Sequence, residues 1–141
     1  VNSDIVRKEL LKEPIIRKTM EKIRTVDYAL TGIADVSLEH PKSTWAGYLT
    51  ERKKRELERK GAVGYLCGYF LDKDGNKLPD PINDKIIGIS FEDLKRVPHI
   101  IAAAGGLDKT NAIRAALKGN LIHCLITDSR IAEKLLAMRD S

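Results

Sequence analysis

The chain has 141 residues, of which 43% are hydrophobic and 32% are charged, and its formal net charge is +5. This length suffices for one domain with its own core, and the composition excludes a disordered or collagen-like chain. Two cysteines, Cys67 and Cys124, are too few for a disulfide-stapled secreted scaffold and favour a reducing cytoplasm. No apolar run reaches the ~20 residues that a membrane-spanning helix needs, and no signal peptide is visible, so we expect no membrane partner.

The first part of the chain predicts two helices, a strand and a third helix. Apolar residues recur at a spacing near 3.6 between residues 3 and 25, which is typical of helix. Pro14 does not fit inside a helix, so we expect a break there, with Pro14 near the start of the second helix. Residues 27–33 are predicted as a short buried strand followed by a loop, and residues 43–60 as a helix ended by Gly61.

Most of the basic charge lies in one run, residues 51–60. Glu51 and Arg55 are four residues apart, as are Glu56 and Lys60, in the order that favours ion pairs on a helix. Few aromatic residues lie nearby to stack on bases. The run therefore predicts a solvated helix face in preference to a surface that follows nucleic-acid phosphates.

The middle of the chain predicts a hairpin. Residues 62–72 are apolar and predict one strand, and Asp74-Gly75 is a strong signal for the hairpin turn after it. The return segment contains Pro79 and Pro81, which suit an edge strand or a loop. A further short strand is predicted at residues 85–89.

The second half alternates helix and strand. Its predicted elements are a short helix over residues 91–96 capped by Ser90, a strand at 98–104, a turn at Gly105-Gly106, a helix at 108–118, a strand at 121–126, and a last helix capped by Thr127-Asp128 and ending at Met138. Such alternation predicts an α/β fold with a parallel sheet and right-handed crossovers.

The best candidate site is the turn at residues 104–109. Gly105 and Gly106 let the backbone turn tightly and approach a ligand closely. The helix start that follows offers unpaired N–H groups and a positive dipole end, which disfavours Lys109 there unless it has an anionic partner. Ligands in open α/β sheets bind at the carboxyl ends of strands, so the sequence predicts an anion site here. An ordinary turn, with Lys109 paired to Asp108 or to solvent, is the alternative.

Other polar residues give weaker signals. The loop predicted at residues 32–37 would either form a second wall of the same crevice or merely connect two elements. His40, His99 and His123 lie apart, without the spacing of metal ligands, so we expect no metal site and no catalytic histidine. His99 and His123 lie in apolar segments and are predicted to be satisfied core residues.

Three stretches resemble, in order and spacing, the effector domain of SorC-type regulators, also called the DeoR-like sugar-binding group. They are residues 61–75, 87–98 and 100–117, and residues 125–128 continue the pattern. The resemblance implies a Rossmann-like, mostly parallel sheet with flanking helices, similar to ribose-phosphate isomerases and glucosamine-phosphate deaminases. It also implies that residues 1–141 are a single partial effector-binding domain, truncated at its N-terminal side.

The same resemblance implies a function. Members of the family bind a phosphorylated sugar, and this binding changes how the oligomeric regulator binds the operator DNA of genes of carbohydrate metabolism. We therefore expect a phosphorylated sugar as partner, a homo-oligomer, and contact with operator DNA only through a helix-turn-helix outside this chain. No cofactor is implied, and an enzymatic activity is not expected.

The family's Ala-Gly-Gly-x-x-Lys motif uses its lysine to contact the ligand, and that residue is Lys109 here. The family often has an acidic residue where this chain has Tyr65, and a Gly-Ile-Gly loop where this chain has Gly32-Ile33-Ala34. A phenol still hydrogen-bonds a sugar hydroxyl but carries no charge at neutral pH. The predicted effector-binding residues are Gly32, Ile33, Gly64, Tyr65, Gly105, Gly106 and Lys109.

Two alternatives stand beside the sensor. On the related fold the chain would be a sugar-phosphate isomerase or deaminase, in which Lys109 forms a Schiff base with a sugar aldehyde. No carboxylate or histidine near Lys109 in sequence is a convincing general base, which counts against this hypothesis. The second alternative is a module that only assembles the regulator.

Overall fold

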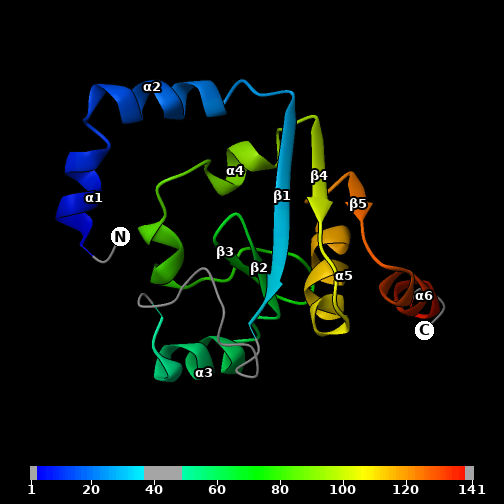
Figure 1. Cartoon of the computed structure of the whole chain (residues 1–141). Helices are drawn as coiled ribbons and strands as arrows, with labels where there is room; N and C mark the ends of the chain where they lie inside the picture. The colour runs from blue at the N-terminus through cyan, green and yellow to red at the C-terminus, as the bar shows by residue number, and fades with distance from the viewer. Residues whose placement is uncertain (1–2, 37–48, 139–141) are drawn as a thin grey trace.

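The structure, a computed structural model, describes residues 3–36 and 49–138 (Figure 1). Its helices are α1 (Asp4–Leu10), α2 (Pro14–Ile23), α3 (Glu51–Arg59), α4 (Phe91–Leu94), α5 (Thr110–Lys118) and α6 (Ser129–Ala137), with 3₁₀ helices η1 (Pro81–Lys85) and η2 (Leu107–Lys109). Its strands are β1 (Tyr28–Asp35), β2 (Gly64–Leu66), β3 (Tyr69–Leu71), β4 (His99–Ala103) and β5 (Cys124–Ile126). The α/β class is confirmed, as is the break at Pro14, which is the first residue of α2.

The five strands form one mixed sheet in the order β3-β2-β1-β4-β5. β1, β4 and β5 run parallel, and β4, α5 and β5 form the predicted strand–helix–strand unit (Figure 1). β2 pairs antiparallel with the last three residues of β1, and β3 pairs antiparallel with β2. The prediction of a mostly parallel sheet was therefore wrong for β2 and β3. A tight hairpin reverses the chain within two residues, so its two strands pair antiparallel.

The strand predicted over residues 62–72 is in fact two strands. Cys67 and Gly68 form a two-residue turn with φ of 50° and 87°, the two positive values of a type I′ hairpin. The predicted turn at Asp74-Gly75 is also present, but it joins β3 to a return segment that forms only an isolated β-bridge, between Leu71 and Lys77, and no strand. The hairpin therefore turns seven residues earlier than its strongest sequence signal, at Cys67-Gly68 and not at Asp74-Gly75.

α3 ends as predicted but starts later. The N–H groups of Gly61 and Ala62 donate to the carbonyls of Glu58 and Leu57, and Gly61 has φ of 90°, as a left-handed helix end requires. At the other end, the Thr50 hydroxyl accepts a hydrogen bond from the Lys53 N–H, so the helix begins at Glu51 and not at residue 43. The rest of the predicted extension, residues 43–48, lies outside the described residues.

The strand predicted at residues 85–89 is absent from the described sheet. Asp80 caps η1 and Pro81 begins it, so the chain is helical up to Lys85. Beyond it, side chains satisfy the carbonyls that a strand would pair: Arg7 Nε donates to Ile86 O at 3.0 Å and Tyr69 Oη donates to Ile89 O at 2.9 Å.

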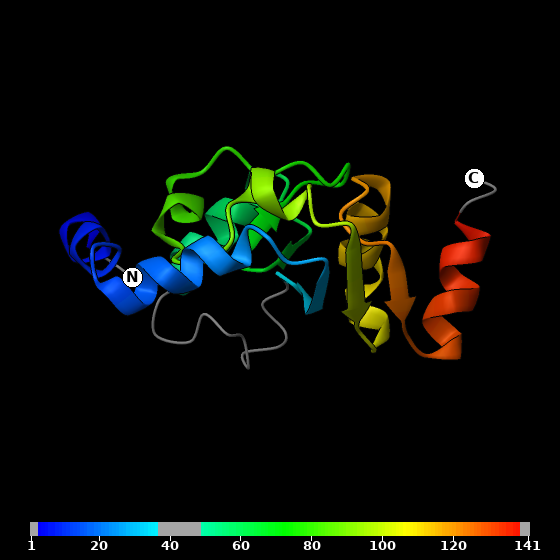
Figure 2. The same ribbon diagram turned by 90° about the horizontal axis from the view of Figure 1, so that it is seen from above.

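Two apolar clusters hold the sheet. The larger one packs β1, β2 and β4 against α4, α5 and α6 through alternate side chains such as Ile33, Ile100 and Ile113. The smaller one lies on the other side of the β2–β3 hairpin, where Tyr65 and Phe70 pack under α3. Figure 2 shows α5 standing on one face of the parallel strands.

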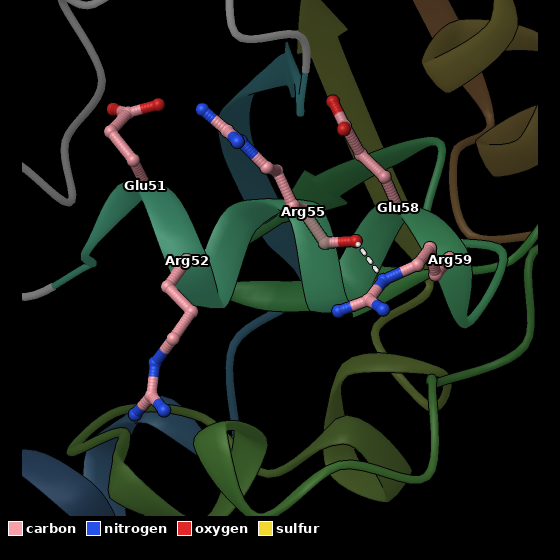
Figure 3. Close-up of a pocket in the computed structure, with 5 residues that line it drawn as sticks. All are labelled: Glu51, Arg52, Arg55, Glu58 and Arg59. Carbon is pink, nitrogen blue, oxygen red and sulfur yellow. Dashed lines mark hydrogen bonds between the residues drawn. The ribbon is translucent and has the colours of Figure 1, made fainter.

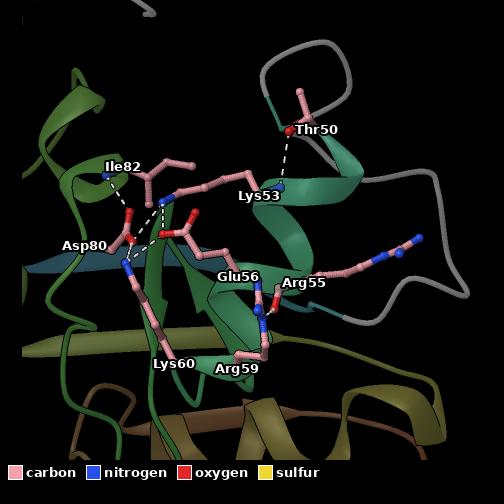
Figure 4. Close-up of polar contacts among 8 residues, drawn as sticks. All are labelled: Thr50, Lys53, Arg55, Glu56, Arg59, Lys60, Asp80 and Ile82. Atoms are coloured by element: carbon pink, nitrogen blue, oxygen red, sulfur yellow. Dashed lines mark hydrogen bonds and ion pairs between the residues drawn. The ribbon is translucent and has the colours of Figure 1, made fainter.

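An ion cluster around the buried Asp80 ties α3 to η1 (Figure 4). The Asp80 side chain is fully buried and its Oδ2 accepts hydrogen bonds from Lys53 Nζ at 2.9 Å and Lys60 Nζ at 2.7 Å. Its Oδ1 accepts from the Ile82 N–H, and Glu56 bridges the same two lysines. Burial raises the pKa of Asp80, but the hydrogen bonds from Lys60 and Lys53 outweigh it and hold this pKa at about 2.

We expect Asp80→Asn to lower the free energy of unfolding by about 2 kcal/mol at pH 7, because the folded pKa lies well below the usual 3.8. A depressed carboxyl pKa stabilises the folded state above about pH 4, and this contribution is lost as pH falls toward 2. Urea unfolding at pH 7 and pH 2.5 measures both values. Asp84→Asn, an exposed carboxylate in the same turn, is the control. An equal loss at both pH values would contradict the assignment.

Candidate functional site

The carboxyl ends of β1, β4 and β5 meet at one edge of the sheet, the lower edge in Figure 1. From β4 the chain continues into Gly105 and Gly106, and from β5 into Thr127 and Asp128. This edge is where ligands bind in open α/β sheets, and the predicted Gly-Gly turn lies there.

The turn is tight and leads directly into α5. Gly106 has φ of 101°, which a side chain would strain, and its carbonyl accepts a hydrogen bond from the Lys109 N–H at 3.0 Å. The buried Thr110 hydroxyl donates to Leu107 O at 2.7 Å and fixes the start of the helix. Gly105, Gly106 and Lys109 are therefore brought together as predicted.

Lys109 closes the 3₁₀ turn η2 immediately before α5 and is half-buried. Among the described residues its ammonium forms no ion pair, so the predicted alternative of a pair with Asp108 is not formed. A cation held at the start of a helix faces the positive dipole end. An anionic ligand would pair with the Lys109 ammonium and would also interact favourably with the positive end of the helix dipole.

Asp128 connects the Gly-Gly turn to α6. Its Oδ1 accepts a hydrogen bond from the Ile131 N–H at 3.1 Å, which confirms the predicted helix cap. Its Oδ2 accepts from the Gly106 N–H at 3.0 Å, a contact across 22 residues. The N–H groups of Gly106 and Ile131 lower the pKa of Asp128. The Asp128 carboxylate thus accepts the hydrogen bond of the Gly106 N–H, an amide that the predicted anion site would offer to a ligand.

Asp128→Ala is expected to lower Tm by a few degrees, because α6 loses its cap and the turn loses its bond to Gly106. Asp128→Ser is the matched control: its hydroxyl still caps Ile131 but is too short to reach Gly106. It should recover part of the Tm, while the Gly106 amide exchanges faster than in the parent protein. Full recovery of both readouts would contradict the second contact.

Gly32 and Ile33 lie inside β1. The loop predicted to begin at residue 32, as a second wall of the crevice or as a plain connection, is therefore strand as far as Asp35. β1 continues to Asp35 because β2 extends the pairing there. Ile33 is 2% exposed and packs in the larger core cluster, so its side chain is covered by core residues. Gly32 pairs with Ala103, and an added Cβ would meet only ordinary contact at 3.8 Å from Ala103 O.

Gly64 and Tyr65 lie beside this edge but serve packing. A Cβ on Gly64 would stand 2.2 Å from Ala112 Cβ, so only glycine lets β2 approach α5. Tyr65 is buried in the smaller cluster, where its ring centroid is 5.4 Å from that of Phe70. The strand pairing brings Gly64 opposite Asp35 at the end of β1. Neither residue shares the turn of Lys109.

Two more polar side chains lie at this edge, in segments that the sequence singled out but did not include among the predicted effector-binding residues. Asp35 ends β1, and alternation places it on the same face as Ile33, toward α5. Thr127 donates through its hydroxyl to Ala104 O at 2.7 Å, which holds the end of β4 against the end of β5. The signal was available, since each residue directly follows or ends an apolar strand.

The two described histidines, His99 and His123, each have a defined contact. His123 Nδ1 accepts a hydrogen bond from the Ile100 N–H at 3.0 Å, and His99 stacks on Tyr28 with ring centroids 4.6 Å apart. Both are exposed, so the core position predicted for them was wrong, and His40 lies outside the described residues. Within residues 3–36 and 49–138 no three metal-binding side chains converge. No helix in this part of the chain has the length and apolarity to cross a bilayer.

The arginines of the basic run lie on a solvated face of α3, as predicted, but Lys54 of the same run is buried at 7% exposure. A shallow depression there is lined by Glu51, Arg52, Arg55, Glu58 and Arg59 (Figure 3). The arginines do not converge, since Arg52 and Arg55 point to opposite sides of the helix. Of the two expected ion pairs, the one between Glu56 and Lys60 is present at 2.8 Å, whereas Glu51 pairs with Lys54.

Comparison with known proteins shows the family of the chain. Residues 1–137 match the family model described as "Putative sugar-binding domain". The transcriptional regulator LsrR of Enterobacter sp. (strain 638) is 36% identical over 140 residues, and LsrR of Klebsiella pneumoniae is 34% identical over 140 residues. Each alignment covers 98% of this chain and 43% of the relative, so the chain spans less than half the length of these regulators.

Solved structures share the fold. A DeoR family transcriptional regulator from Listeria monocytogenes superposes with a TM-score of 0.86 at 33% identity, over 96% of this chain and 54% of that one. Full-length SorC from Klebsiella pneumoniae has the same fold, with a TM-score of 0.88 at 24% identity, over 96% of this chain and 44% of that one. These relatives are transcriptional regulators and not enzymes. The chain belongs to the sugar-binding domain family of SorC- and DeoR-type transcriptional regulators.

Proposed function

We propose that this chain senses a phosphorylated sugar at the Gly105–Lys109 turn. The observation that carries the proposal is the half-buried residue Lys109, whose ammonium forms no ion pair within the described residues and which lies between β4 and α5. A phosphate dianion fits this place because it is favoured by the helix dipole and forms charge-assisted hydrogen bonds with lysine.

The glycines give the ligand room. Neither Gly105 nor Gly106 has a side chain to cover Lys109, and the Asp128 carboxylate already shows that the Gly106 N–H attracts an anion. The effector phosphate therefore lies at Lys109 and the start of α5. It lies beside the Gly106 N–H, which donates its hydrogen bond to Asp128. The sugar hydroxyls would extend toward the ends of β1 and β2, where Asp35 pairs with Gly64.

Within a complete regulator the chain would be one part of the effector-binding domain. Operator DNA would be contacted by a helix-turn-helix elsewhere in the protein, and the regulator would act as a homo-oligomer in the cytoplasm on genes of carbohydrate metabolism. The two cysteines are unpaired, as a reducing compartment favours.

A thermal-shift panel tests the proposal. Sugar phosphates are compared pairwise with the corresponding free sugars and with inorganic phosphate at equal concentration. At least one phosphorylated sugar should raise Tm more than its free sugar and more than phosphate, since a ligand bound only to the folded state stabilises it. No such difference in protein shown to be folded by circular dichroism would defeat the proposal for this chain.

A further inference from the structure

One face of the parallel strands is apolar and exposed. Side chains alternate along β1, β4 and β5, so every second residue belongs to this face. Its members include Tyr28 and Leu30 of β1, Ile101 and Ala103 of β4, and Cys124 and Ile126 of β5. Leu30 is 76% exposed, Tyr28 67% and Ile126 58%. We call this set the open face.

The opposite face of the same strands is covered. Ile33, Ile100 and Ala102 are at most 2% exposed and pack with α5 (Figure 2). Parallel sheets are normally covered on both faces, because their crossover helices pack on either side and their strands are apolar throughout. The open face therefore has the composition of an interior surface without the layer that normally covers it.

β1 also has an open edge. Residues Tyr28–Gly32 pair with β4 on one side, and Ile33–Asp35 pair with β2 on the other. On the side of β2, Tyr28–Gly32 have no strand partner among the described residues. Five residues at about 3.3 Å each offer a gap of about 16 Å, enough for one short strand. Such an edge binds another strand through its backbone groups.

We infer that the open face and the open edge together dock a strand-and-helix unit from the remaining part of a regulator of this family. The strand pairs with Tyr28–Gly32, and the helix packs on Leu30 and Ile126. The length of the solved relatives supports this occupant, because this chain matches only 54% of the Listeria monocytogenes chain. The inference does not depend on which effector binds at Lys109.

A second copy of this chain fits the edge poorly. A two-fold axis would pair β1 antiparallel with itself about Leu30, which sets Ile33–Asp35 of one copy opposite Thr25–Asp27 of the other. The β2 strand is attached to Ile33–Asp35 on this same edge. It would therefore overlap the segment Thr25–Asp27 of the other copy.

The test uses a chimera in which this sequence replaces the matched part of the Listeria monocytogenes regulator, beside the chain alone. In the chimera, amides of Tyr28–Gly32 that face the open edge should exchange at least about tenfold more slowly than in the chain alone. Leu30→Arg should lower Tm by about 5 °C or more in the chimera, because it places a charge in an apolar interface. In the chain alone, where Leu30 is exposed, the shift should stay below about 2 °C.

Ile15→Arg is the matched control, since Ile15 is 77% exposed on α2 and lies away from the sheet. It should shift Tm by less than about 2 °C in both proteins. The inference would be overturned if Leu30→Arg lowered Tm equally in the chimera and in the chain alone. It would also be overturned if Leu30→Arg and Ile15→Arg lowered the Tm of the chimera equally. A discrete dimer of the chain alone that Leu30→Arg dissociates would overturn it as well, because the occupant would then be a second copy. A parent chimera that does not fold also counts against it, since the superposition makes the exchange geometrically conservative.

Discussion

Lys109→Ala is expected to weaken binding of a phosphorylated sugar at least tenfold, which is about 1.4 kcal/mol. A charge-assisted hydrogen bond to phosphate is worth ~1.5–3 kcal/mol, and the half-buried ammonium is held at the start of α5 by the turn before it. Because Lys109 forms no ion pair within the described residues, its loss should leave Tm without ligand unchanged. Calorimetric titration with the sugar phosphate that gives the largest thermal shift measures Kd.

Two variants separate a specific contact from a general loss of positive charge. Lys22→Ala removes an exposed lysine from α2, next to the amino end of β1, and should leave Kd unchanged. Lys109→Arg keeps the charge and should bind more tightly than the alanine variant. An unchanged Kd in Lys109→Ala would remove this residue from the site, even if the thermal-shift panel finds a ligand.

Gly75→Ala should have the largest effect on stability, lowering the free energy of unfolding by about 3 kcal/mol or more. Gly75 has φ of 79°, and an added Cβ would stand 2.3 Å from Ala115 O and 2.6 Å from Gly119 Cα. The turn at Asp74-Gly75 rests directly on the C-terminal end of α5. Left-handed strain of about 1–2 kcal/mol and an overlap of about 1–3 kcal/mol therefore add. Urea unfolding measures the sum.

Gly61→Ala provides the matched control. Gly61 has φ of 90° at the end of α3, but nothing lies within 4 Å of an added Cβ. Its substitution carries the left-handed strain alone and should lower the free energy of unfolding by about 1 kcal/mol. Equal losses at Gly61 and Gly75 would show that backbone strain, and not the approach to α5, makes glycine necessary at position 75.

Much of the fold could be predicted because local rules and the final structure agree. Pro14 and Gly61 mark helix boundaries, and the helices and strands after residue 90 follow apolar periodicity with clear caps. The errors lie where a tertiary contact overrides the local pattern. Cys67 takes φ of 50°, which few non-glycine residues adopt, so the run of residues 62–72 gave no sign of its turn. Residues 85–89 look like a strand, but side chains distant in sequence bind their carbonyls.

The candidate site divides in the same way. Gly105, Gly106 and Lys109 could be located because a strand, a turn and a helix follow one another within a few residues. The second contact of Asp128 could not, since it joins residues 22 apart and depends on how β4 and β5 align. The resemblance pointed to Gly32 and Ile33, yet Gly32 pairs with β4 and Ile33 with β2, so both lie inside the strand.

The central place of β1 has a consequence for the order of events during synthesis. β1 precedes both of its partners in this chain, because β2 begins 29 residues after β1 ends, at Gly64, and β4 begins only at His99. Loop closure over such distances is slow compared with formation of α1, α2 or α3. The apolar strand β1 therefore has no partner until β2 has been made, and Tyr28–Gly32 have none until β4 has been made. During this interval the nascent protein is most exposed to aggregation.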